Sequence, residues 1–236
     1  MGHLQIIPTA DGSNTIFNSE VGENYHSRHG ALQESRHVFL ESGLKYFLSN
    51  LGAESISVLE VGFGTGLNFL LSADYCIAQN IPLHYTGIEA YPLTLEMISQ
   101  TGYAQYVQEN LWQQFIHNYE QVLQGPVDLP SANGQLQTNR TCQLQIANCK
   151  LLDFNAKQQF DVIYFDAFAA IYQPEMWDEA AISHTLQFLK PGGVFVTYAI
   201  TGNLKRIIKS LGLKVEKAPG APGKREMLRA TKWQIS

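Results

Sequence analysis

A glycine-rich loop with an acidic residue ahead of it is the first feature of the sequence that could carry chemistry. Gly62, Gly64 and Gly66 follow a short apolar run and precede residues that can begin a helix, as in loops that hold nucleotide-type cofactors. A dinucleotide-binding loop would place its third glycine at position 67, which is Leu. Glu60 would oppose a pyrophosphate and instead suits a ligand with an ammonium or sulfonium group, such as S-adenosylmethionine. A tight turn without a ligand would also explain the glycines.

Two further acids lie at the ends of predicted buried strands. Glu89 ends LHYTGIE, where an acid can accept hydrogen bonds from both ribose hydroxyls of a bound nucleoside. Asp166 follows FDVIYF, and an ionised Asp beside so apolar a strand needs a partner. The alternatives without a ligand are a surface ion pair for Glu89 and a turn-capping role for Asp166.

The residues after Asp166 suggest contacts with a substrate. Asp166-Ala167-Phe168 resembles the D/N-P-P-F/Y loop of amino-methylating enzymes, in which the polar group holds the target nitrogen and the aromatic ring stacks on its base. Trp177 could also stack on a base, or it could pack in the core.

Basic residues gather toward the C-terminal end of the sequence. From Ile200 onward there are nine Lys or Arg and two acidic residues, out of 16 and 21 in the whole chain. Such a sector could seat a polyanion such as RNA, or it could be a solvated edge. The candidates for phosphate contacts are Lys205, Arg206, Lys224 and Arg225.

The periodicity predicts elements that would bring these residues together. We expect a hairpin over residues 3–18, a helix of about five turns from near Gly30, and buried strands alternating with helices from residue 56 onward. Turns are expected at Asn133-Gly134 and at Pro191-Gly192-Gly193. This order indicates a doubly wound, mostly parallel α/β sheet with an antiparallel strand near the end. Residues 1–50 would form an extension packed on a core domain of residues 51–236.

The bulk composition narrows the class of protein. The 236 residues, 45% of them hydrophobic, suffice for one good core. No apolar run approaches the roughly 18 residues that cross a bilayer, and the first residues do not resemble a signal peptide. Cys76, Cys142 and Cys149 lack metal-type spacing and are expected to be thiols in a reducing cytoplasm. We therefore expect a cytoplasmic protein without a metal or a membrane segment, in which histidines such as His26 are structural.

Several separated motifs together resemble one family. YHSRHGALQESRHVFLESGL, LEVGFGTGLNFLL, GIEAYPL, FDVIYFDAFAAIYQPEMW, LKPGGVFVTYA and PGKREMLRA are similar to the methyltransferase domain of MnmC and its stand-alone counterpart MnmD. These are class I S-adenosylmethionine-dependent methyltransferases with a Rossmann-like, seven-stranded sheet. The resemblance covers nearly the whole chain. It implies methylation of 5-aminomethyl-(2-thio)uridine at the wobble position of tRNA, through contacts with the anticodon stem-loop.

The resemblance also implies roles for single residues. The cofactor-binding residues would be Glu60, Gly62, Gly64, Gly66, Asn68, Glu89 and Asn148. Asp166 would face the amine. Asn148 stands where the family has an adenine-contacting Asp, with Asp153 as a less favoured substitute, and Ala170 stands where the family has Pro. Because the flavin-dependent oxidase domain of MnmC has no counterpart in this sequence, we expect a separate enzyme to supply the aminomethyl precursor.

The chemistry raises one difficulty. An alkyl amine with a pKa of roughly 10.4 is protonated at neutral pH, and its neutral form costs about 4–5 kcal/mol. A nearby carboxylate favours the ammonium, so we expect Asp166 to align the nitrogen while water removes the proton. An aminopropyltransferase acting on a small amine, and a catalytically silent RNA-binding or cofactor-sensing protein, remain as alternatives.

Overall fold

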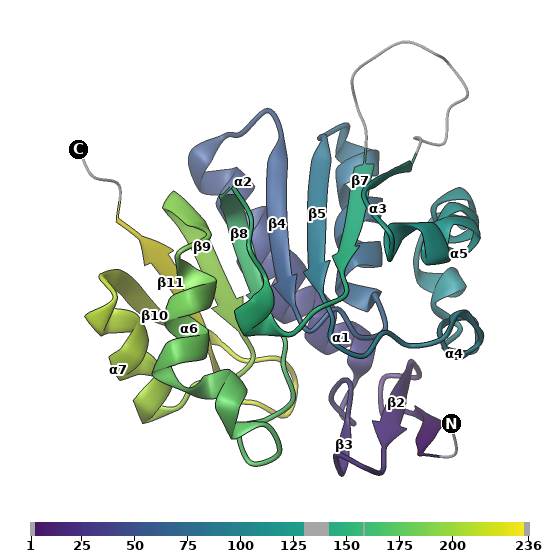
Figure 1. Ribbon diagram of the computed structural model, residues 1–236, viewed down its shortest axis with the longest axis horizontal. Helices are drawn as coiled ribbons and strands as arrows, with labels where there is room; N and C mark the ends of the chain where they lie inside the picture. The colour runs from purple at the N-terminus through teal and green to yellow at the C-terminus, as the bar shows by residue number, and fades with distance from the viewer. Residues whose placement is uncertain (1–2, 130–141, 158, 234–236) are drawn as a thin grey trace.

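One mixed sheet organises the computed structural model, which describes residues 3–129, 142–157 and 159–233 (Figure 1). Within them the sheet has eight strands in the order β10-β11-β9-β8-β4-β5-β7-β6. The strands are β4 (Ile56–Val61), β5 (Leu83–Ile88), β6 (Val127–Leu129), β7 (Cys142–Ala147), β8 (Phe160–Phe165), β9 (Leu189–Thr197), β10 (Leu213–Pro219) and β11 (Glu226–Lys232). The neighbours from β7 to β9 pair in parallel, whereas β11 runs antiparallel to β9 and β10. The predicted seven-stranded, mostly parallel sheet is confirmed, with the short antiparallel β6 added at one edge.

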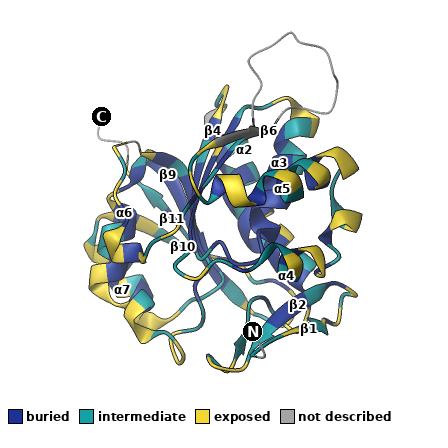
Figure 2. Ribbon diagram, turned by 45° about the vertical axis from the view of Figure 1, so that its right-hand side comes forward, coloured by how far each residue is buried: buried dark blue, intermediate teal, exposed yellow. Residues whose placement is uncertain are grey.

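Helices cover both faces of the sheet, and successive side chains along a strand point into two different hydrophobic cores. On β4, Val58 belongs to one hydrophobic cluster and Leu59 to the other, as expected for a strand buried on both sides. The first cluster includes α3 (Leu67–Gln79), α4 (Leu95–Ser99), the 3₁₀ turn η2 (Tyr103–Tyr106) and α5 (Glu109–Val122). The second includes η3 (Leu151–Asp153), η4 (Pro174–Trp177), α6 (Glu179–Leu186) and α7 (Gly202–Ser210). Figure 2 shows the buried residues along the strands and exposed residues on the outer sides of α5 and α7.

The N-terminal segment adds a small sheet and a long helix. β1 (Leu4–Pro8) and β2 (Asn14–Asn18) form the expected hairpin, and β3 (Glu23–Asn24) extends it. The predicted five-turn helix is confirmed as α1 (Ala31–Glu34), the π-helical η1 (Ser35–Lys45) and α2 (Tyr46–Leu51) in direct succession. The division into residues 1–50 and 51–236 stays a prediction.

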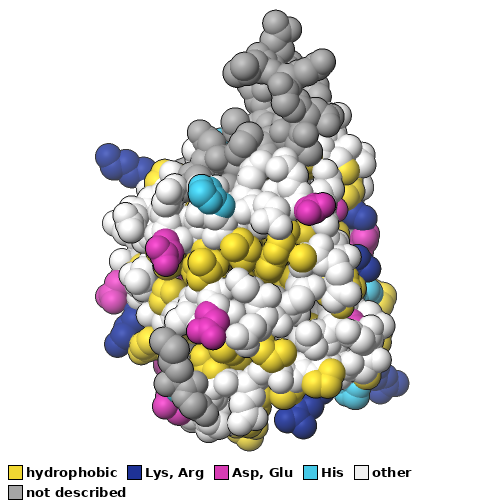
Figure 3. Space-filling view, turned by 90° about the vertical axis from the view of Figure 1, so that its right-hand side faces the viewer, with side chains coloured by type: hydrophobic (Ala, Val, Ile, Leu, Met, Phe, Trp, Pro, Cys, Tyr) yellow, Lys and Arg dark blue, Asp and Glu magenta, His cyan; other side chains and the backbone are white. Residues whose placement is uncertain are grey.

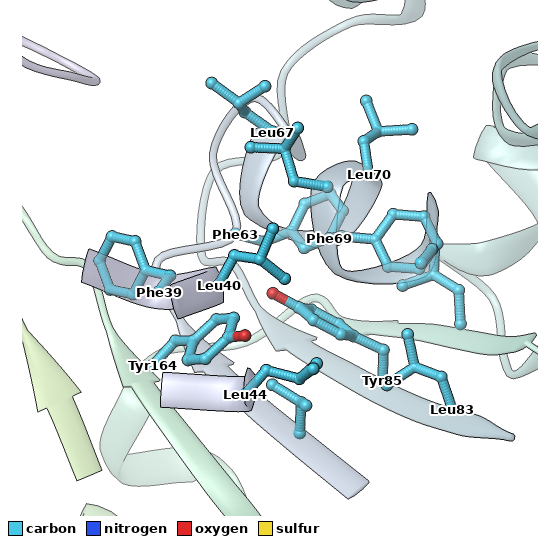
Figure 4. Packing of buried hydrophobic residues seen from close by; sticks show 14 of the residues in the cluster. Phe39, Leu40, Leu44, Phe63, Leu67, Phe69, Leu70, Leu83, Tyr85 and Tyr164 are labelled. Carbon is cyan, nitrogen blue, oxygen red and sulfur yellow. The ribbon is translucent and has the colours of Figure 1, made fainter. Parts of the chain in front are cut away.

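The middle of this helix packs closely on the sheet. A Cβ at Gly43 would lie 2.9 Å from atoms of both Tyr164 and Val196. Figure 4 shows Phe39, Leu40 and Leu44 beside the rings of Tyr164 and Tyr85, with Phe63 and Phe69 beyond them. The side chains of η1 therefore reach the face of the sheet that also carries the glycine loop.

Neither of the two turns predicted from the sequence is found among the residues that the structure describes. Pro191-Gly192-Gly193 lies inside β9, where Phe160 pairs with Leu189 but Val162 pairs with Val194. The glycines thus form a bulge in a strand, with φ 79° at Gly192, and the predicted turn is wrong. The turn expected at Asn133-Gly134 lies outside the described residues. In the part of the chain that the structure describes, no helix is long and apolar enough to cross a membrane.

Candidate functional site

A cavity of about 1110 Å³ lies at the carboxyl ends of β4, β5 and β8. Ligands of open α/β sheets bind at this edge. Of the candidate cofactor and substrate residues, those that line the cavity are Gly62, Gly64, Glu89, Asp153, Asp166 and Phe168. The N-terminal sheet closes one side with Tyr25 and His26, whose Nε2 lies 2.8 Å from the Thr65 hydroxyl. This wall was not predicted from the sequence, in which the motif YHSRHGALQESRHVFLESGL is the signal that could have indicated it.

The glycine loop needs glycine at its first two positions. Gly62 has φ 84°, and a Cβ there would lie 2.4 Å from the carbonyl oxygen of Asp166. Gly64 has φ 51°, and a Cβ there would lie 2.9 Å from the ring of Tyr25. The glycine loop therefore contacts both the loop that begins at Asp166 and the N-terminal wall of the cavity. Gly66 precedes α3 and packs near Phe63 and Phe115, and it does not itself line the cavity.

Glu89 is fixed at the cavity by backbone hydrogen bonds. Its Oε2 accepts from the Gly64 N–H at 2.9 Å, and its Oε1 accepts from the Tyr91 N–H at 3.0 Å. Burial raises the pKa of Glu89 above its ordinary value. Each carboxylate oxygen keeps a second lone pair, so the group can still accept hydrogen bonds from a ligand.

Glu60 and Asn68 lie behind the cavity wall and do not line it. Glu60 is fully buried, and its two carboxylate oxygens accept hydrogen bonds from the Tyr85 hydroxyl and the Asn68 amide, both at 2.7 Å. The same Asn68 nitrogen donates to Asp166 Oδ2 at 2.8 Å. The geometry therefore argues against direct contact of Glu60 and Asn68 with the cofactor. Burial and the nearby Asp166 raise the pKa of Glu60 well above its ordinary value.

The loop after Asp166 is held by three side chains from different elements. The Tyr198 hydroxyl donates to the Ala167 carbonyl at 2.9 Å, Trp177 Nε1 donates to the Phe168 carbonyl at 2.7 Å, and Glu23 Oε2 accepts from the Ala169 N–H at 2.7 Å. These bonds restrain the loop without a proline at position 170, which is Ala.

Trp177 and Phe168 differ in their access to a ligand. Trp177 is buried, and its ring lies edge-on to Phe165, 5.1 Å away. The stacking role considered for Trp177 is therefore wrong, and core packing is its role. Phe168 lines the cavity and contacts Tyr25 edge-on at 5.0 Å, so its ring is available to a substrate.

Charged side chains near Asp166 alter its pKa. Lys224 Nζ pairs with Glu34 Oε2 at 2.5 Å and lies 4.0 Å from the centre of the Tyr198 ring. This ion pair replaces the phosphate contact expected for Lys224. Burial and the charges of Glu34 and Glu23 outweigh the lowering effects of Asn68 and Lys224, and the pKa of Asp166 rises to about 8.

This shift predicts a change of stability with pH. Unfolded Asp titrates near 3.8 and folded Asp166 near 8, so the folded state holds an extra proton between these values. The free energy of unfolding should therefore fall as pH rises from about 4 to 8. Asp166→Asn removes this loss and should be more stable than the wild type at pH 8.5 by about 1–3 kcal/mol, with a much smaller gain at pH 4.5. Urea unfolding at both pH values measures it, and an equal difference at the two values would contradict the shift.

The other predicted contacts lie at or outside the rim. Asn148 is exposed and does not line the cavity, whereas Cys149 and Asp153 do. Arg206 and Arg225 are exposed and Lys205 is half-buried, on the α7 and β11 side of the molecule. Figure 3 shows the opposite side, where hydrophobic side chains form a band and Lys and Arg lie toward the margins. In residues 3–129, 142–157 and 159–233, no group of His, Cys, Asp or Glu is arranged to hold a metal ion.

Comparisons with known proteins identify the family. A family model described as S-adenosyl-L-methionine-dependent methyltransferase matches residues 106–233, more than half of the chain. The bifunctional protein MnmC of Marinobacter nauticus, named for tRNA 5-methylaminomethyl-2-thiouridine biosynthesis, is 32% identical over 217 residues, which are 88% of this chain and 33% of that protein. This chain thus spans about a third of the length of the curated relatives it matches.

Two solved structures share the fold. MnmC2 from Aquifex aeolicus matches with a TM-score of 0.70 and 21% identity, over 99% of this chain and 73% of that one. Spermidine synthase from Thermotoga maritima matches with a TM-score of 0.55 and 12% identity, over 97% of this chain and 68% of that one. The family model covers the sheet from β6 to β11, and the relative that is 32% identical matches 88% of the chain. The chain therefore belongs to the S-adenosyl-L-methionine-dependent methyltransferases.

Proposed function

We propose that the protein transfers a methyl group from S-adenosylmethionine to the primary amine of 5-aminomethyl-(2-thio)uridine at the wobble position of tRNA. The product would be 5-methylaminomethyl-(2-thio)uridine. The observation that carries the proposal is that Asp166 faces the same cavity as the glycine loop and Glu89. The name of the Marinobacter nauticus relative supports this choice of nucleoside.

The cavity residues fit the cofactor. When bound, S-adenosylmethionine supplies a methyl group on a sulfonium. Glu89 would accept hydrogen bonds from the ribose hydroxyls, and the backbone at Gly62 and Gly64, which lines the cavity, would lie beside the methionine part. Because Asp153 lines the cavity and Asn148 does not, we assign the adenine contact to Asp153.

Asp166 would bind the amine and take its proton. The sulfonium and the substrate ammonium both favour its carboxylate form, so Asp166 ionises as the site fills. Its raised pKa of about 8 makes it a stronger base than an ordinary Asp. From the value of about 8 in the empty site, the gap to an amine of roughly 10.4 corresponds to about 3 kcal/mol, and the gap widens as the positive charges enter. We propose that Asp166, in direct contact with the ammonium, accepts the proton in place of the water expected from the sequence.

The rim of the cavity is suited to an unstacked nucleotide. Tyr91 and Leu152 line the cavity and are 73% and 58% exposed, and the half-buried ring of Phe168 lines it as well. The aromatic rings of Tyr91 and Phe168 can stack on a splayed-out base of a single-stranded loop. We propose that Phe168 stacks on the uridine and that Lys205, Arg206 and Arg225 contact phosphates of the anticodon stem-loop. A separate enzyme supplying the aminomethyl group remains part of the proposal.

Transfer of a labelled methyl group tests this function. The protein is incubated with methyl-labelled S-adenosylmethionine and tRNA carrying 5-aminomethyl-2-thiouridine, and the nucleosides are analysed by mass spectrometry. We expect label in 5-methylaminomethyl-2-thiouridine, and none with tRNA that lacks the aminomethyl group. Absence of label from every nucleoside, or label only in added small amines, would reject the proposal.

A further inference from the structure

A buried hydrogen-bonded chain runs from the interior of the sheet to the cavity. The Tyr85 hydroxyl donates to Glu60 Oε2 at 2.7 Å, and the single Asn68 amide nitrogen donates to Glu60 Oε1 at 2.7 Å and to Asp166 Oδ2 at 2.8 Å. An amide nitrogen has two hydrogens, so both are used and the plane of the amide is fixed by two carboxyl groups. Asn68 lies in the first turn of α3, directly after the glycine loop.

The arrangement costs stability at Asn68. Its carbonyl oxygen is buried and has no hydrogen-bond partner among the described residues. An unpaired buried acceptor is unfavourable, so a residue chosen for packing alone would be apolar here. The orientation of the Asn68 amide leaves its oxygen without a hydrogen bond, while its two N–H groups donate to Glu60 and Asp166.

We propose that Asn68 is a positioning residue for methyl transfer, which orients the Asp166 carboxyl group toward the substrate amine and is itself anchored by Glu60. This rests on the proposed function of Asp166. Asn68 does not line the cavity, so it acts through Asp166 and not on the cofactor. The second oxygen of Asp166, Oδ1, is thereby left for the amine.

Asn68 should also help Asp166 to ionise. Its hydrogen bond stabilises the carboxylate and lowers the pKa of Asp166, against the raising effects of burial, Glu34 and Glu23. The charged and titratable groups around Asp166 are Glu60, Glu34, Glu23, Lys224, Tyr198 and Tyr85. Asn68→Leu also removes the hydrogen bond to Glu60, so a variant that changes only the bonding of Glu60 must show how much of any shift in the acid limb of the pH–rate profile comes from there.

The test compares Asn68→Leu, which has a similar shape but no N–H, with Tyr85→Phe, which breaks the same chain at its far end. Asn68→Leu should lower kcat by about 10- to 100-fold and move the acid limb of kcat/KM upward by about one pH unit. Its affinity for S-adenosylhomocysteine should stay within about threefold of wild type. Tyr85→Phe should leave the acid limb within about 0.3 pH units, because Asp166 keeps its donor.

A double variant separates positioning from a structural or cofactor role. In an Asp166→Asn background, Asn68→Leu should cause no further loss of kcat, because the residue through which it acts is already gone. Full additivity of the two losses, or weakened binding of S-adenosylhomocysteine by Asn68→Leu alone, would overturn the proposal. If the wild type methylated no amine, the proposed function itself would be rejected. That outcome differs from failure of the Asn68 proposal, in which the wild type is active and the variants show additive losses or weakened binding of S-adenosylhomocysteine. Circular dichroism and thermal unfolding confirm that each variant is folded.

Discussion

Asp166→Asn is expected to lower kcat for methyl transfer by about 10²–10⁴-fold while binding S-adenosylhomocysteine with wild-type affinity. The Asn amide keeps the size of the side chain and an acceptor oxygen for Asn68, so the loop geometry is retained. It cannot take a proton from the substrate ammonium. S-adenosylhomocysteine is the right ligand for the binding measurement because its neutral sulfur does not interact with the charge of Asp166.

Single-turnover kinetics and calorimetry on the same preparations separate the two effects. Glu41→Gln is the matched control, since Glu41 is an exposed carboxylate paired with Lys45 on η1. It should leave kcat and binding unchanged. If Asp166→Asn retained more than about a tenth of the wild-type rate, Asp166 would not be the proton acceptor.

Gly62→Ala is expected to destabilise the fold by at least about 3 kcal/mol and to abolish measurable cofactor binding. Two costs combine at this position. An Ala is strained at φ 84°, and its Cβ would lie 2.4 Å from the backbone oxygen of Asp166, which no side-chain movement relieves. Either the glycine loop or the Asp166 loop must move, and the cavity is formed between them.

Gly12→Ala isolates the conformational part of this cost. Gly12 has the same φ of 84° in the β1–β2 turn, but nothing lies within 4 Å of an added Cβ. It should lose only about 1–2 kcal/mol and bind S-adenosylhomocysteine normally. Urea unfolding and calorimetry measure both variants. Equal losses in the two would show that the close approach of the loops is unimportant.

The fold was predictable because its core strands carry a strong local signal. Apolar runs such as FDVIYF end in polar residues, and a helical segment follows each run. This alternation predicts parallel strands joined by helices. The bulge at Gly192 was not predictable, because Pro-Gly-Gly is also a typical turn sequence and the pairing with β8 decides between the two. The close approach of Gly43 on η1 to Tyr164 and Val196 likewise joins residues far apart in the sequence.

The candidate site was only partly predictable from the sequence. Glu89 and Asp166 were found because the carboxyl ends of neighbouring parallel strands share one edge. The burial of Glu60 depends on α3 covering one face of β4, and the pairing of Lys224 with Glu34 joins residues from opposite ends of the chain. The backbone oxygen that satisfies the Trp177 indole is also invisible in sequence spacing. These contacts require tertiary structure.

A crystal structure of the protein with S-adenosylhomocysteine tests the central claim most directly. The adenosine ribose should contact Glu89, the amino-acid part should lie over Gly62 and Gly64, and the sulfur should face Asp166 across the cavity. A ligand bound elsewhere, or one whose sulfur points away from Asp166, would contradict the assignment of this cavity as the place of methyl transfer.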